Sequence, residues 1–404
     1  MAPGELMAER RDSDVDTRSV ALEGRKVLVG ITGGIAAVES VRLLRELRRH
    51  GAELTVMMTH SAQRVITPLA VEWASQTPVL TDWSPEMSQL DRFDGILVSP
   101  ATRQTIAAHV HGILDTPLQM ALSAGRGSRT PTVFVPSMHG SLFDDPVTDD
   151  LCQTLQQHGH HVIWGPEEEG RMKQPDPVSV VAELCHIINS NIASRKRVVV
   201  TLGANRSALD AVRWIQNTSS GKTGWHIAEY LYRMGHEVTV VAGDYSHDPS
   251  FSLPSVHHEV TPDGMLNVLV ELAESTLRPD AWIHCAAVLD YCVSSPSMEK
   301  VKSGSEEWSI QLSRSAKHLD ELTPLCKGST RIAFKLESGA SDEQLVERAH
   351  SLIDIHSLTA VVANHLEEVD SQDRRAIWVP SEGERKDIAD INSLSEMVEQ
   401  AICG

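Results

Sequence analysis

The chain has 404 residues, which predicts two or three domains at roughly 100–200 residues per domain. Hydrophobic residues make up 41% and charged residues 23%, as in ordinary globular proteins, and no apolar run is long enough to cross a membrane. The formal net charge of −19 argues against a protein that binds nucleic acid or a membrane surface, because phosphate groups attract basic proteins. There is no apolar signal segment and the six cysteines lack metal-binding spacings, so we expect a cytoplasmic protein with reduced cysteines.

The first half of the chain begins with polar, charged residues 1–23, which we expect to form a disordered tail. An apolar run at 26–31 predicts a buried strand, and a glycine turn and an amphipathic helix over 38–51 follow it. Strand and helix patterns then alternate along the chain: strands at 53–59, 94–100, 130–138 and 162–166, and a helix at 104–114. This alternation predicts a parallel sheet flanked by helices, in a domain over 24–190.

A second series of strands and helices starts at Lys196, after a short polar link over 189–195. Strands are predicted at 197–204, 237–244, 280–288, 331–338 and 358–366, and helices at 222–236, 263–276 and 341–356. We therefore expect an α/β protein with two doubly wound parallel-sheet, Rossmann-like domains, the second over 195–404.

The glycine turn over 32–37 lies between the first predicted strand and its helix. Glycines there let the backbone approach a phosphate group, and the helix N-terminus supplies N–H donors. Such turns occur in all doubly wound folds, so this turn alone does not distinguish a ligand site from ordinary packing.

Several ordered segments over residues 24–185 resemble the flavin-dependent cysteine decarboxylase family: the glycine turn, the S-P-A-T loop at 99–102, the V-P-S-M segment and the W-G-P…G-R-M segment. The resemblance implies a flavoprotein-type domain that holds FMN at a trimer interface and decarboxylates 4′-phosphopantothenoylcysteine. It implies FMN contacts at Gly33, Gly34, Ile35, Ser99, Ala101 and Thr102.

The chain departs from that family at three functional positions. Glu86 or Met87 stands at the approximate place of the family's catalytic histidine. The family's P-A-M-N motif reads P-S-M-H in this chain, so that His139 replaces the asparagine. The flap over 167–172, which carries a cysteine in the family, has none here. Glutamate and histidine differ in unperturbed pKa by about two units, so the proton chemistry would change. We expect a degenerate decarboxylase kept as a scaffold, with FMN or without it; a bifunctional enzyme with an altered site and a non-catalytic regulatory homologue are the alternatives.

The segment 209–224 ends in S-S-G-K-T-G at the start of a predicted helix. Small hydroxyl and glycine residues at a helix N-terminus suit a phosphate group. It is not a Walker A loop, because Gln216 occupies the place of its first glycine. An ordinary helix capped by Ser219 or Ser220 would have the same composition.

Five ordered motifs over residues 195–380 resemble phosphopantothenate–cysteine ligase: R-x-I-x-N-x-S-S-G-K-x-G, then Cys285 to Tyr291, Glu299 to Lys302, Ala333 to Ser338, and Val361 to Asn364. Together the two halves resemble the bifunctional coenzyme A biosynthesis family. The ligase reaction activates the carboxylate of 4′-phosphopantothenate as an acyl-nucleotidylate, which the amine of cysteine then attacks.

The resemblance implies catalytic roles for Asn217, which would hold the acyl intermediate, and for Lys300. It implies nucleotide or intermediate contacts at Ser219, Ser220, Gly221, Gly224, Ala286, Ala287, Asp290, Lys302, Lys317, Phe334 and Asn364. Asp290 is also the expected Mg²⁺ ligand, since it follows a buried strand. A solvated surface charge at Lys302 and a core role for Phe334 are the simpler interpretations.

The nucleotide is predicted to be ATP in preference to CTP. The bacterial CTP-dependent form carries N-P-D-I where this chain has residues 314–319, and the motifs at 334–338 and 361–364 resemble the eukaryotic ATP-dependent form. The expected partners are the small molecules 4′-phosphopantothenate and cysteine, within a homo-oligomer that has trimeric and dimeric contacts. A ligase for another acid and amine is a further alternative.

Overall fold

The computed structural model describes residues 11–168, 171–302, 307–368 and 374–404. The chain divides into two compact units, Met1–Asn189 (unit 1) and Ser190–Gly404 (unit 2). Within the described ranges, no helix is both long and apolar enough to cross a membrane.

Unit 1 is built on a six-stranded sheet in which all neighbouring strands are parallel. The spatial order, with the strand ranges, is β3 (Val79–Leu80), β2 (Glu53–Met58), β1 (Lys26–Ile31), β4 (Gly95–Ala101), β5 (Thr132–Pro136) and β7 (His161–Val162). The order reverses between β1 and β4, which creates a crevice at their carboxyl ends where ligands of such sheets bind. The predicted doubly wound fold is confirmed for this unit.

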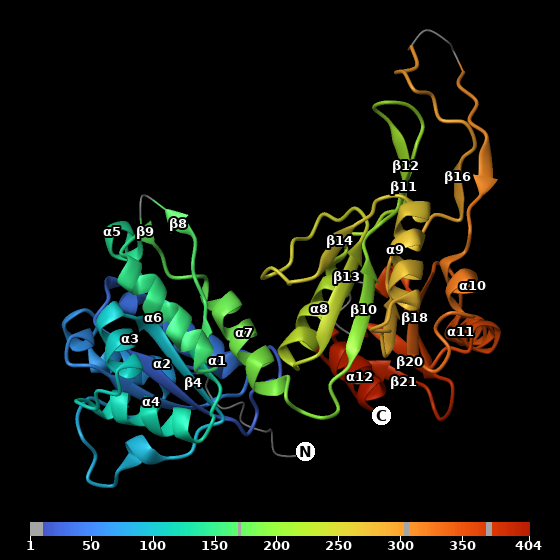
Figure 1. The fold of residues 1–404 in the computed structure, drawn as a ribbon. Helices are drawn as coiled ribbons and strands as arrows, with labels where there is room; N and C mark the ends of the chain where they lie inside the picture. Colours follow the sequence, from blue (N-terminus) through green and yellow to red (C-terminus); the bar gives the residue numbers. More distant parts are fainter. Residues whose placement is uncertain (1–10, 169–170, 303–306, 369–373) are drawn as a thin grey trace. The chain divides into compact units, whose positions relative to one another are not determined.

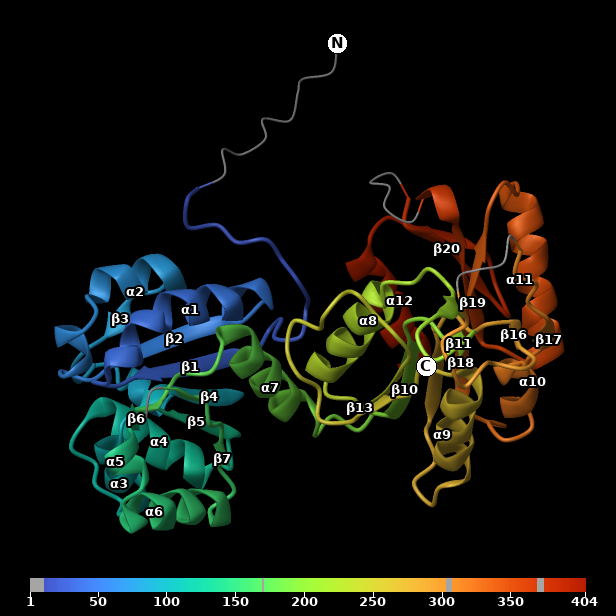
Figure 2. The same cartoon turned by 90° about the horizontal axis from the view of Figure 1, so that it is seen from above.

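Helices cover both faces of this sheet, as Figure 2 shows for α1 and α2 on one side and α3, α4 and α6 on the other. The main helices are α1 (Ser40–Arg49), α2 (Pro68–Ser75), α3 (Arg103–Val110), α4 (Pro117–Gly127), α5 (Gly140–Phe143), α6 (Pro146–Gln157) and α7 (Pro177–Asn189). Short 3₁₀ turns lie at η1 (Ile35–Glu39), η2 (Ala62–Arg64) and η3 (Ser88–Leu90). Leu28, Ile96 and Phe134 on the sheet pack with Leu122 and Leu155 of α4 and α6. A core on both sheet faces explains why the strands are continuous apolar runs.

The predicted disordered tail over 1–23 is wrong for residues 11–23, while residues 1–10 lie outside the described ranges. Leu22 is fully buried, and Arg48 of α1 donates to a carbonyl oxygen of the segment at 2.8 Å. The polar composition concealed this packing, because backbone carbonyls and a few side chains such as Leu22 hold the segment, without a periodic apolar face.

Unit 2 is built on an eight-stranded sheet. Its order is β14 (Val256–His258), β13 (Glu237–Ala242), β10 (Arg197–Leu202), β15 (Ala281–His284), β18 (Thr330–Glu337), β19 (Ala360–His365), β20 (Ala376–Pro380) and β21 (Lys386–Ile388). The first six strands are parallel, as predicted, and β20 and β21 extend the sheet in antiparallel fashion. The topology again reverses beside its first strand, between β10 and β15, which predicts a ligand crevice there.

Two groups of helices cover the faces of this sheet (Figure 1): α8 and α12 on one face, and α9, α10 and α11 on the other. Their ranges are α8 (Lys222–Arg233), α9 (Pro262–Glu274), α10 (His318–Leu322), α11 (Asp342–His356) and α12 (Ile391–Cys403), with a 3₁₀ turn at η4 (Leu366–Glu368). Met265 and Leu269 of α9 pack on Trp282, and Leu345 and Ile353 of α11 pack farther along the sheet.

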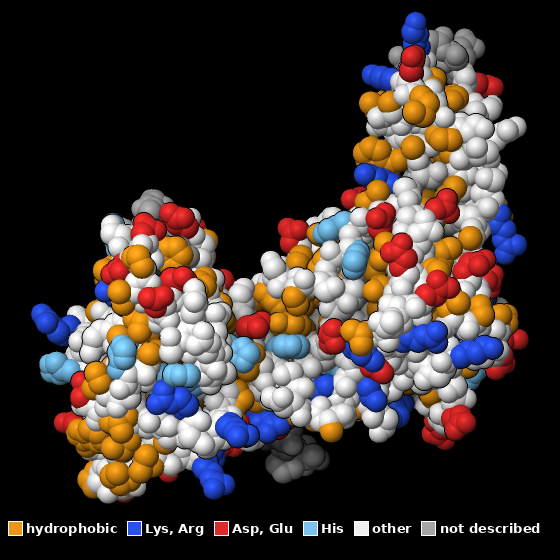
Figure 3. Space-filling view, viewed as in Figure 1, with side chains coloured by type: hydrophobic (Ala, Val, Ile, Leu, Met, Phe, Trp, Pro, Cys, Tyr) orange, Lys and Arg blue, Asp and Glu red, His pale blue; other side chains and the backbone are white. Residues whose placement is uncertain are grey.

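Short ribbons project from the carboxyl ends of the sheets. Unit 1 carries β6 (Met138–His139), β9 (Arg171–Met172) and β8 (Glu167–Glu168). Unit 2 carries two antiparallel pairs, β11 (Arg206–Ala208) with β12 (Trp214–Gln216), and β16 (Tyr291–Val293) with β17 (Leu312–Arg314). Apolar side chains are exposed on the unit 2 ribbons, and Figure 3 shows orange patches there; Trp214 and Tyr291 are among these side chains.

Candidate functional site

At the base of the unit 1 crevice, one hydroxyl group joins two loops by hydrogen bonds. Thr32 Oγ1, directly after β1, donates to the carbonyl oxygen of Pro100 at 2.7 Å and accepts from the main-chain nitrogen of Thr102 at 2.9 Å. The structure thereby brings together the two predicted FMN segments, the glycine turn and the S-P-A-T loop. Ser99 and Ala101 are buried in β4, and Gln174 Nε2 donates to Ser99 Oγ.

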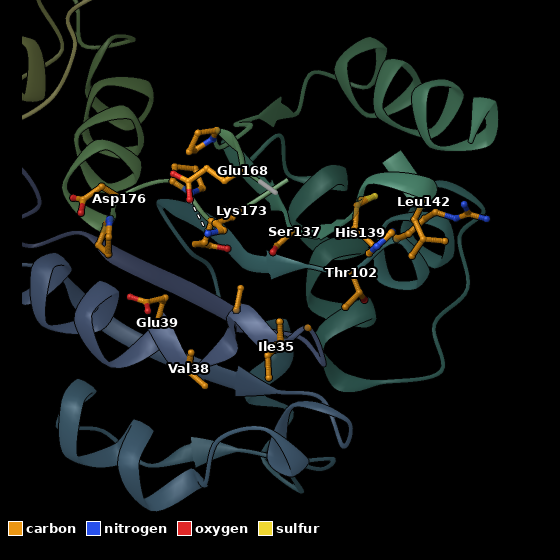
Figure 4. A pocket seen from close by; sticks show the side chains of 18 of the residues that line it. Ile35, Val38, Glu39, Thr102, Ser137, His139, Leu142, Glu168, Lys173 and Asp176 are labelled. Carbon is orange, nitrogen blue, oxygen red and sulfur yellow. Dashed lines mark ion pairs between the residues drawn. The ribbon is translucent and has the colours of Figure 1, made fainter. Parts of the chain in front are cut away.

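A cavity of about 840 Å³ opens above this crevice (Figure 4). Gly34, Ile35 and Thr102 are the predicted FMN residues that line it. Ile35 is 80% exposed, so the cavity has an apolar edge that is open to solvent. Lys173 and Glu168 of the β8–β9 hairpin lie across from the glycine turn and form an ion pair at 2.6 Å. The volume lies within the roughly 300–1,000 Å³ typical of cofactor sites.

A second cavity of about 280 Å³ adjoins the same loops, because Thr102 lines both cavities. Its lining includes Gly33 and the hydroxyl residues Thr59, Ser61 and Thr105. A Cβ atom on Gly33 would lie 2.4 Å from Ser61 Cβ, so a side chain there would push the two walls apart. Hydroxyls beside the N-terminus of α3 make this cavity suitable for a phosphate group.

The three departures from the decarboxylase pattern fall at different places. Among the described residues, the lining of the larger cavity includes neither Glu86 nor Met87. His139 does line it, but its Nδ1 accepts from the main-chain nitrogen of Ser141 at 3.2 Å and so caps α5. A neutral ring with this acceptor at Nδ1 carries its proton on Nε2. His139 therefore caps α5 while its ring also lines the cavity.

In unit 2, α8 packs directly on the end of β10. A Cβ atom on Gly224 would lie 2.4 Å from Leu202 Cβ, so only glycine allows this approach. Gly221 is the N-cap, at φ 76°, so the expected serine cap is displaced by one residue; Ser220 Oγ still accepts from the main-chain nitrogen of Lys222 at 3.4 Å. A left-handed N-cap favours glycine over serine, because glycine adopts positive φ without steric cost.

Asn217 connects the β11–β12 hairpin to the end of β15. Its Nδ2 donates to the carbonyl oxygens of Ala287 at 3.2 Å and Val288 at 3.1 Å. Ala287 itself donates to Gly203 after β10, at 2.8 Å. The structure therefore brings Asn217 and Ala287 together at the reversal of the sheet, while Ala286 donates its main-chain N–H to Thr201 Oγ1 at 3.2 Å.

A cavity of about 510 Å³ lies beside Asn217. Ser219 and Ser220 line it, as do Gln216 and Asp244, which are joined by a 2.8 Å hydrogen bond from Gln216 Nε2 to Asp244 Oδ2. Main-chain nitrogens of Ser246 and His247 donate to Ser220 O and close one wall. This cavity is the candidate ligand site of unit 2.

The remaining predicted residues lie outside that cavity lining. Asp290 and Lys317 are exposed, and the main-chain nitrogen of Ser315 donates to Asp290 O at 2.9 Å, which places the Lys317 segment against the start of β16. Lys300 and Lys302 are exposed on the segment that follows the β16 strand.

The other two predicted residues are on neighbouring strands. Phe334 is half-buried on β18, and Asn364 is buried at the end of β19, where its Nδ2 donates to Arg375 O at 2.8 Å. Arg375 in turn donates to Thr223 Oγ1 at 2.7 Å, at the start of α8. Burial raises the pKa of Cys285, in the same crevice, to about 12, so its thiol is not a nucleophile at neutral pH.

Several residues at these sites were missed from the sequence. In unit 2 they are Asp244, Gln216, Tyr245 and Trp214, all in the cavity lining. The position of Asp244 was a usable signal, because it directly follows β13 at the carboxyl edge, next to the topological reversal.

The Asp210–Arg213 pair was also missed. Asp210 has a fully buried side chain and accepts from the guanidinium of Arg213 and from Val301 N at 3.0 Å. The bond from Arg213 holds the pKa of Asp210 well below its usual range. The pair therefore ties the segment that carries Lys300 to the hairpin that leads to Asn217.

Comparison with known proteins covers both units. A flavoprotein family model matches residues 16–189, and the model of the DNA/pantothenate metabolism flavoprotein C-terminal domain matches residues 193–400. The coenzyme A biosynthesis bifunctional protein CoaBC of Thermococcus kodakarensis is 33% identical over 373 residues, which are 90% of this chain and 91% of that protein. CoaBC of Methanocaldococcus jannaschii is 30% identical over 354 residues, 87% of this chain and 86% of that protein.

Among solved structures, the DNA/pantothenate metabolism flavoprotein from Streptococcus pneumoniae aligns with a TM-score of 0.47 and 22% identity, over 51% of this chain and 98% of that one. The two family models match consecutive parts of the chain, and the CoaBC relatives match both units in one alignment. The chain belongs to the family of coenzyme A biosynthesis bifunctional proteins.

Proposed function

We propose that unit 2 ligates 4′-phosphopantothenate to cysteine through an acyl-nucleotidylate. The observation that carries this proposal is the fixed orientation of Asn217 beside the 510 Å³ cavity. Because two carbonyl oxygens accept from its Nδ2, its Oδ1 is left as a hydrogen-bond acceptor. The acid substrate carries amide N–H and hydroxyl donors along its chain, so Asn217 is suited to hold the acyl group.

The first step forms a bond between a carboxylate oxygen of the acid and the α-phosphorus of the nucleotide, and pyrophosphate leaves. In the second step the cysteine ammonium first loses a proton to solvent, and the free amine nitrogen bonds to the acyl carbon. The bond from that carbon to the phosphate oxygen breaks, the nucleoside monophosphate leaves, and the nitrogen releases a second proton to give the amide. The main-chain groups of Ala286 and Ala287, after β15, would lie along the nucleotide. Phe334 lies on the neighbouring strand β18, and Asn364 on the strand beyond it, β19.

Cations must offset the charge of the phosphates during the first step. Lys300, Lys302 and Lys317 are exposed and could reach a bound nucleotide. The Asp290 carboxylate is exposed beside the Lys317 segment, and a single carboxylate together with substrate phosphates is a common way to hold Mg²⁺. We propose ATP as the nucleotide, since the cytosine-reading motif of the CTP-dependent form is missing at 314–319.

Pyrophosphate release tests the ligase directly. The purified chain is given 4′-phosphopantothenate with ATP or CTP and Mg²⁺, first without and then with cysteine. We expect release that depends on the acid, and faster release with ATP. Asn217→Ala should slow product formation by about 100-fold or more, the loss seen when one pre-oriented polar group is removed from an active site.

The matched control is Asn267→Ala, an exposed asparagine on α9, which should retain full activity. If neither nucleotide gives pyrophosphate with the acid, the ligase assignment is wrong, and a ligase for another acid and amine or a non-catalytic homologue takes its place. Faster release with CTP would reverse only the nucleotide preference.

For unit 1, we propose that FMN binds across the two adjoining cavities. Gly33, Gly34 and Thr102 fit this group, because the loops meet without intervening side chains and the smaller cavity has the hydroxyls that a phosphate needs. When bound, FMN supplies an acceptor for the two electrons that leave the cysteine group of the decarboxylase substrate.

We further propose that the decarboxylase half is degenerate. Three features support this: Glu86 and Met87 lie outside the cavity lining, His139 is engaged as a cap, and the flap sequence lacks cysteine. The purified chain should be yellow, with flavin absorbance, and should release no CO₂ from 4′-phosphopantothenoylcysteine. Rapid CO₂ release would establish instead a complete bifunctional enzyme with an altered site, and a colourless protein would contradict FMN binding.

We also propose a homo-oligomer with trimeric and dimeric contacts. The exposed apolar side chains of the unit 2 ribbons, such as Trp214 and Tyr291, support a contact with a second copy. Light scattering should give a mass well above 44.3 kDa for the chain in solution, and a monomer would contradict this proposal.

A further inference from the structure

The unit 2 cavity has an unusual charge balance. Nine residues line it, and Asp244 is the only charged one among them; the lining holds no lysine, arginine or histidine. Nucleotide and phosphate sites normally gather cations or N–H donors, because phosphate oxygens carry negative charge. The wall that carries Asp244 is therefore unsuited to a phosphate and suited to a ligand with a positive charge.

The carboxylate of Asp244 is fixed on one side only. Its Oδ2 accepts from Gln216 Nε2 at 2.8 Å, while Oδ1 has no hydrogen-bond partner within the described ranges. The side chain is half-buried at the end of β13, next to Tyr245, whose ring packs against Trp225 with centroids 5.2 Å apart. Asp244 is thus held in place with one acceptor oxygen left for a ligand.

From this geometry we propose that Asp244 binds the ammonium group of the amino-acid substrate, an inference that rests on the proposed ligase function. Asp244 and Asn217 line the same cavity, so an amine bound at Asp244 lies beside the expected acyl group. Four of the residues predicted to contact the nucleotide lie outside this cavity lining: Ala286 and Ala287 follow β15, Phe334 is on β18 and Asn364 is on β19. The nucleotide would therefore extend from Asn217 toward those strands and away from Asp244. Ser219 and Ser220 also line the cavity and offer hydroxyl donors to the carboxylate of an α-amino acid.

The substitution Asp244→Asn tests this role while preserving the local structure. The two side chains have the same shape, and the asparagine carbonyl oxygen can still accept from Gln216. A hydrogen bond to an ammonium group is charge-assisted, so its loss should raise KM for cysteine by about 10- to 100-fold. Pyrophosphate release in the absence of cysteine should stay within about twofold of the unaltered chain, because that step does not involve the amine.

Asp248→Asn is the matched control. Asp248 is exposed in the same loop and lies outside the cavity lining, so its variant should change neither step. Asp244→Glu provides a second variant that retains the charge but moves it by one methylene; it should raise KM for cysteine by less than Asp244→Asn does.

Two results would overturn the proposal. An unchanged KM for cysteine in Asp244→Asn would show that the carboxylate does not bind the amine. A raised KM for the nucleotide in the first step would show that Asp244 contacts ribose hydroxyls, as an acidic residue after the second strand does in dinucleotide-binding folds. Failure of the unaltered chain to release pyrophosphate would instead contradict the ligase function itself, so the two failures are distinguishable.

Discussion

Thr32 and Thr102 are joined through the side chain of one and the backbone of the other: Thr32 Oγ1 accepts from Thr102 N at 2.9 Å while it donates to Pro100 O at 2.7 Å. Thr32 is 1% exposed, so water does not compete for this hydroxyl. The same group therefore fixes both loops of the unit 1 crevice, although the loops are about 70 residues apart in sequence.

Thr32→Val removes the hydroxyl that joins these two loops, while the side chain keeps almost the same shape. It leaves the N–H of Thr102 without its acceptor, at a cost of about 1–3 kcal/mol in the free energy of unfolding of unit 1. Urea unfolding measures this loss, and flavin absorbance after gel filtration should fall in parallel. Thr32→Ser, which keeps the hydroxyl, should retain most of both; equal losses in the two variants would show that the methyl group, and not the hydroxyl, matters.

A buried histidine pair should make unit 1 sensitive to acid. His109 Nε2 and His160 Nε2 lie 3.1 Å apart beside Phe134, and burial, with the nearby positive charges, lowers the pKa of His109 to about 3 and of His160 to about 4. Both rings are therefore neutral in the folded state at pH values where the unfolded chain binds protons, below its pKa of about 6.5. The contribution of these two histidines to the free energy of unfolding is fully present above pH 6.5. It falls as the pH is lowered toward 4, by up to about 1.4 kcal/mol per histidine for each pH unit.

Urea unfolding at about pH 7 and about pH 5, followed by hydrogen exchange of unit 1 amides, measures this slope. His160→Gln should flatten it, because one of the two titrating rings is removed. His111→Gln changes an exposed histidine two residues from His109 and should leave the slope intact. A slope that is the same in all three chains would mean that other groups govern the acid sensitivity.

The strands and helices that the sequence predicted are those with local periodic signals. Continuous apolar runs such as 26–31 and 197–202 are strands in the structure because both faces of each sheet are covered. The antiparallel strands β20 and β21 were missed, since a short apolar run does not reveal its direction in a sheet. The hydrogen bond from Gln216 to Asp244 crosses 28 residues, so no spacing rule could have predicted it.

Because Gly224 lies so close to Leu202, any side chain at position 224 should destabilise unit 2. Gly224→Ala places a methyl group 2.4 Å from Leu202 Cβ, which forces α8 away from β10 and from the cavity beside Asn217. Overpacking of this kind costs about 1–3 kcal/mol, and the ligase should lose most of its activity. Gly127→Ala at the end of α4 is the control, because open space surrounds that position and alanine is the better helix former; a stable, active Gly224→Ala would contradict the close packing.

The Asp210–Arg213 pair should control the position of Lys300. Asp210 accepts from Val301 N at 3.0 Å, and Arg213 donates to Val301 O at 2.9 Å, so the pair holds both polar groups of the residue next to Lys300. Asp210→Asn removes the charge that Arg213 neutralises and leaves a polar group that satisfies fewer of these donors. We expect the segment to open more often, which should speed trypsin cleavage after Lys300 and Lys302 and slow pyrophosphate release.

Cleavage sites identified by mass spectrometry, together with the rate of the first ligase step, check this prediction. Asp354→Asn, an exposed residue on α11, should match the unaltered chain in both measurements. Because the pKa of Asp210 lies well below its usual range, its charge and its contacts persist as the pH falls to about 4. Faster cleavage with an unchanged first step would mean that Lys300 acts only after pyrophosphate has left, whereas unchanged cleavage would show that the pair does not hold this segment.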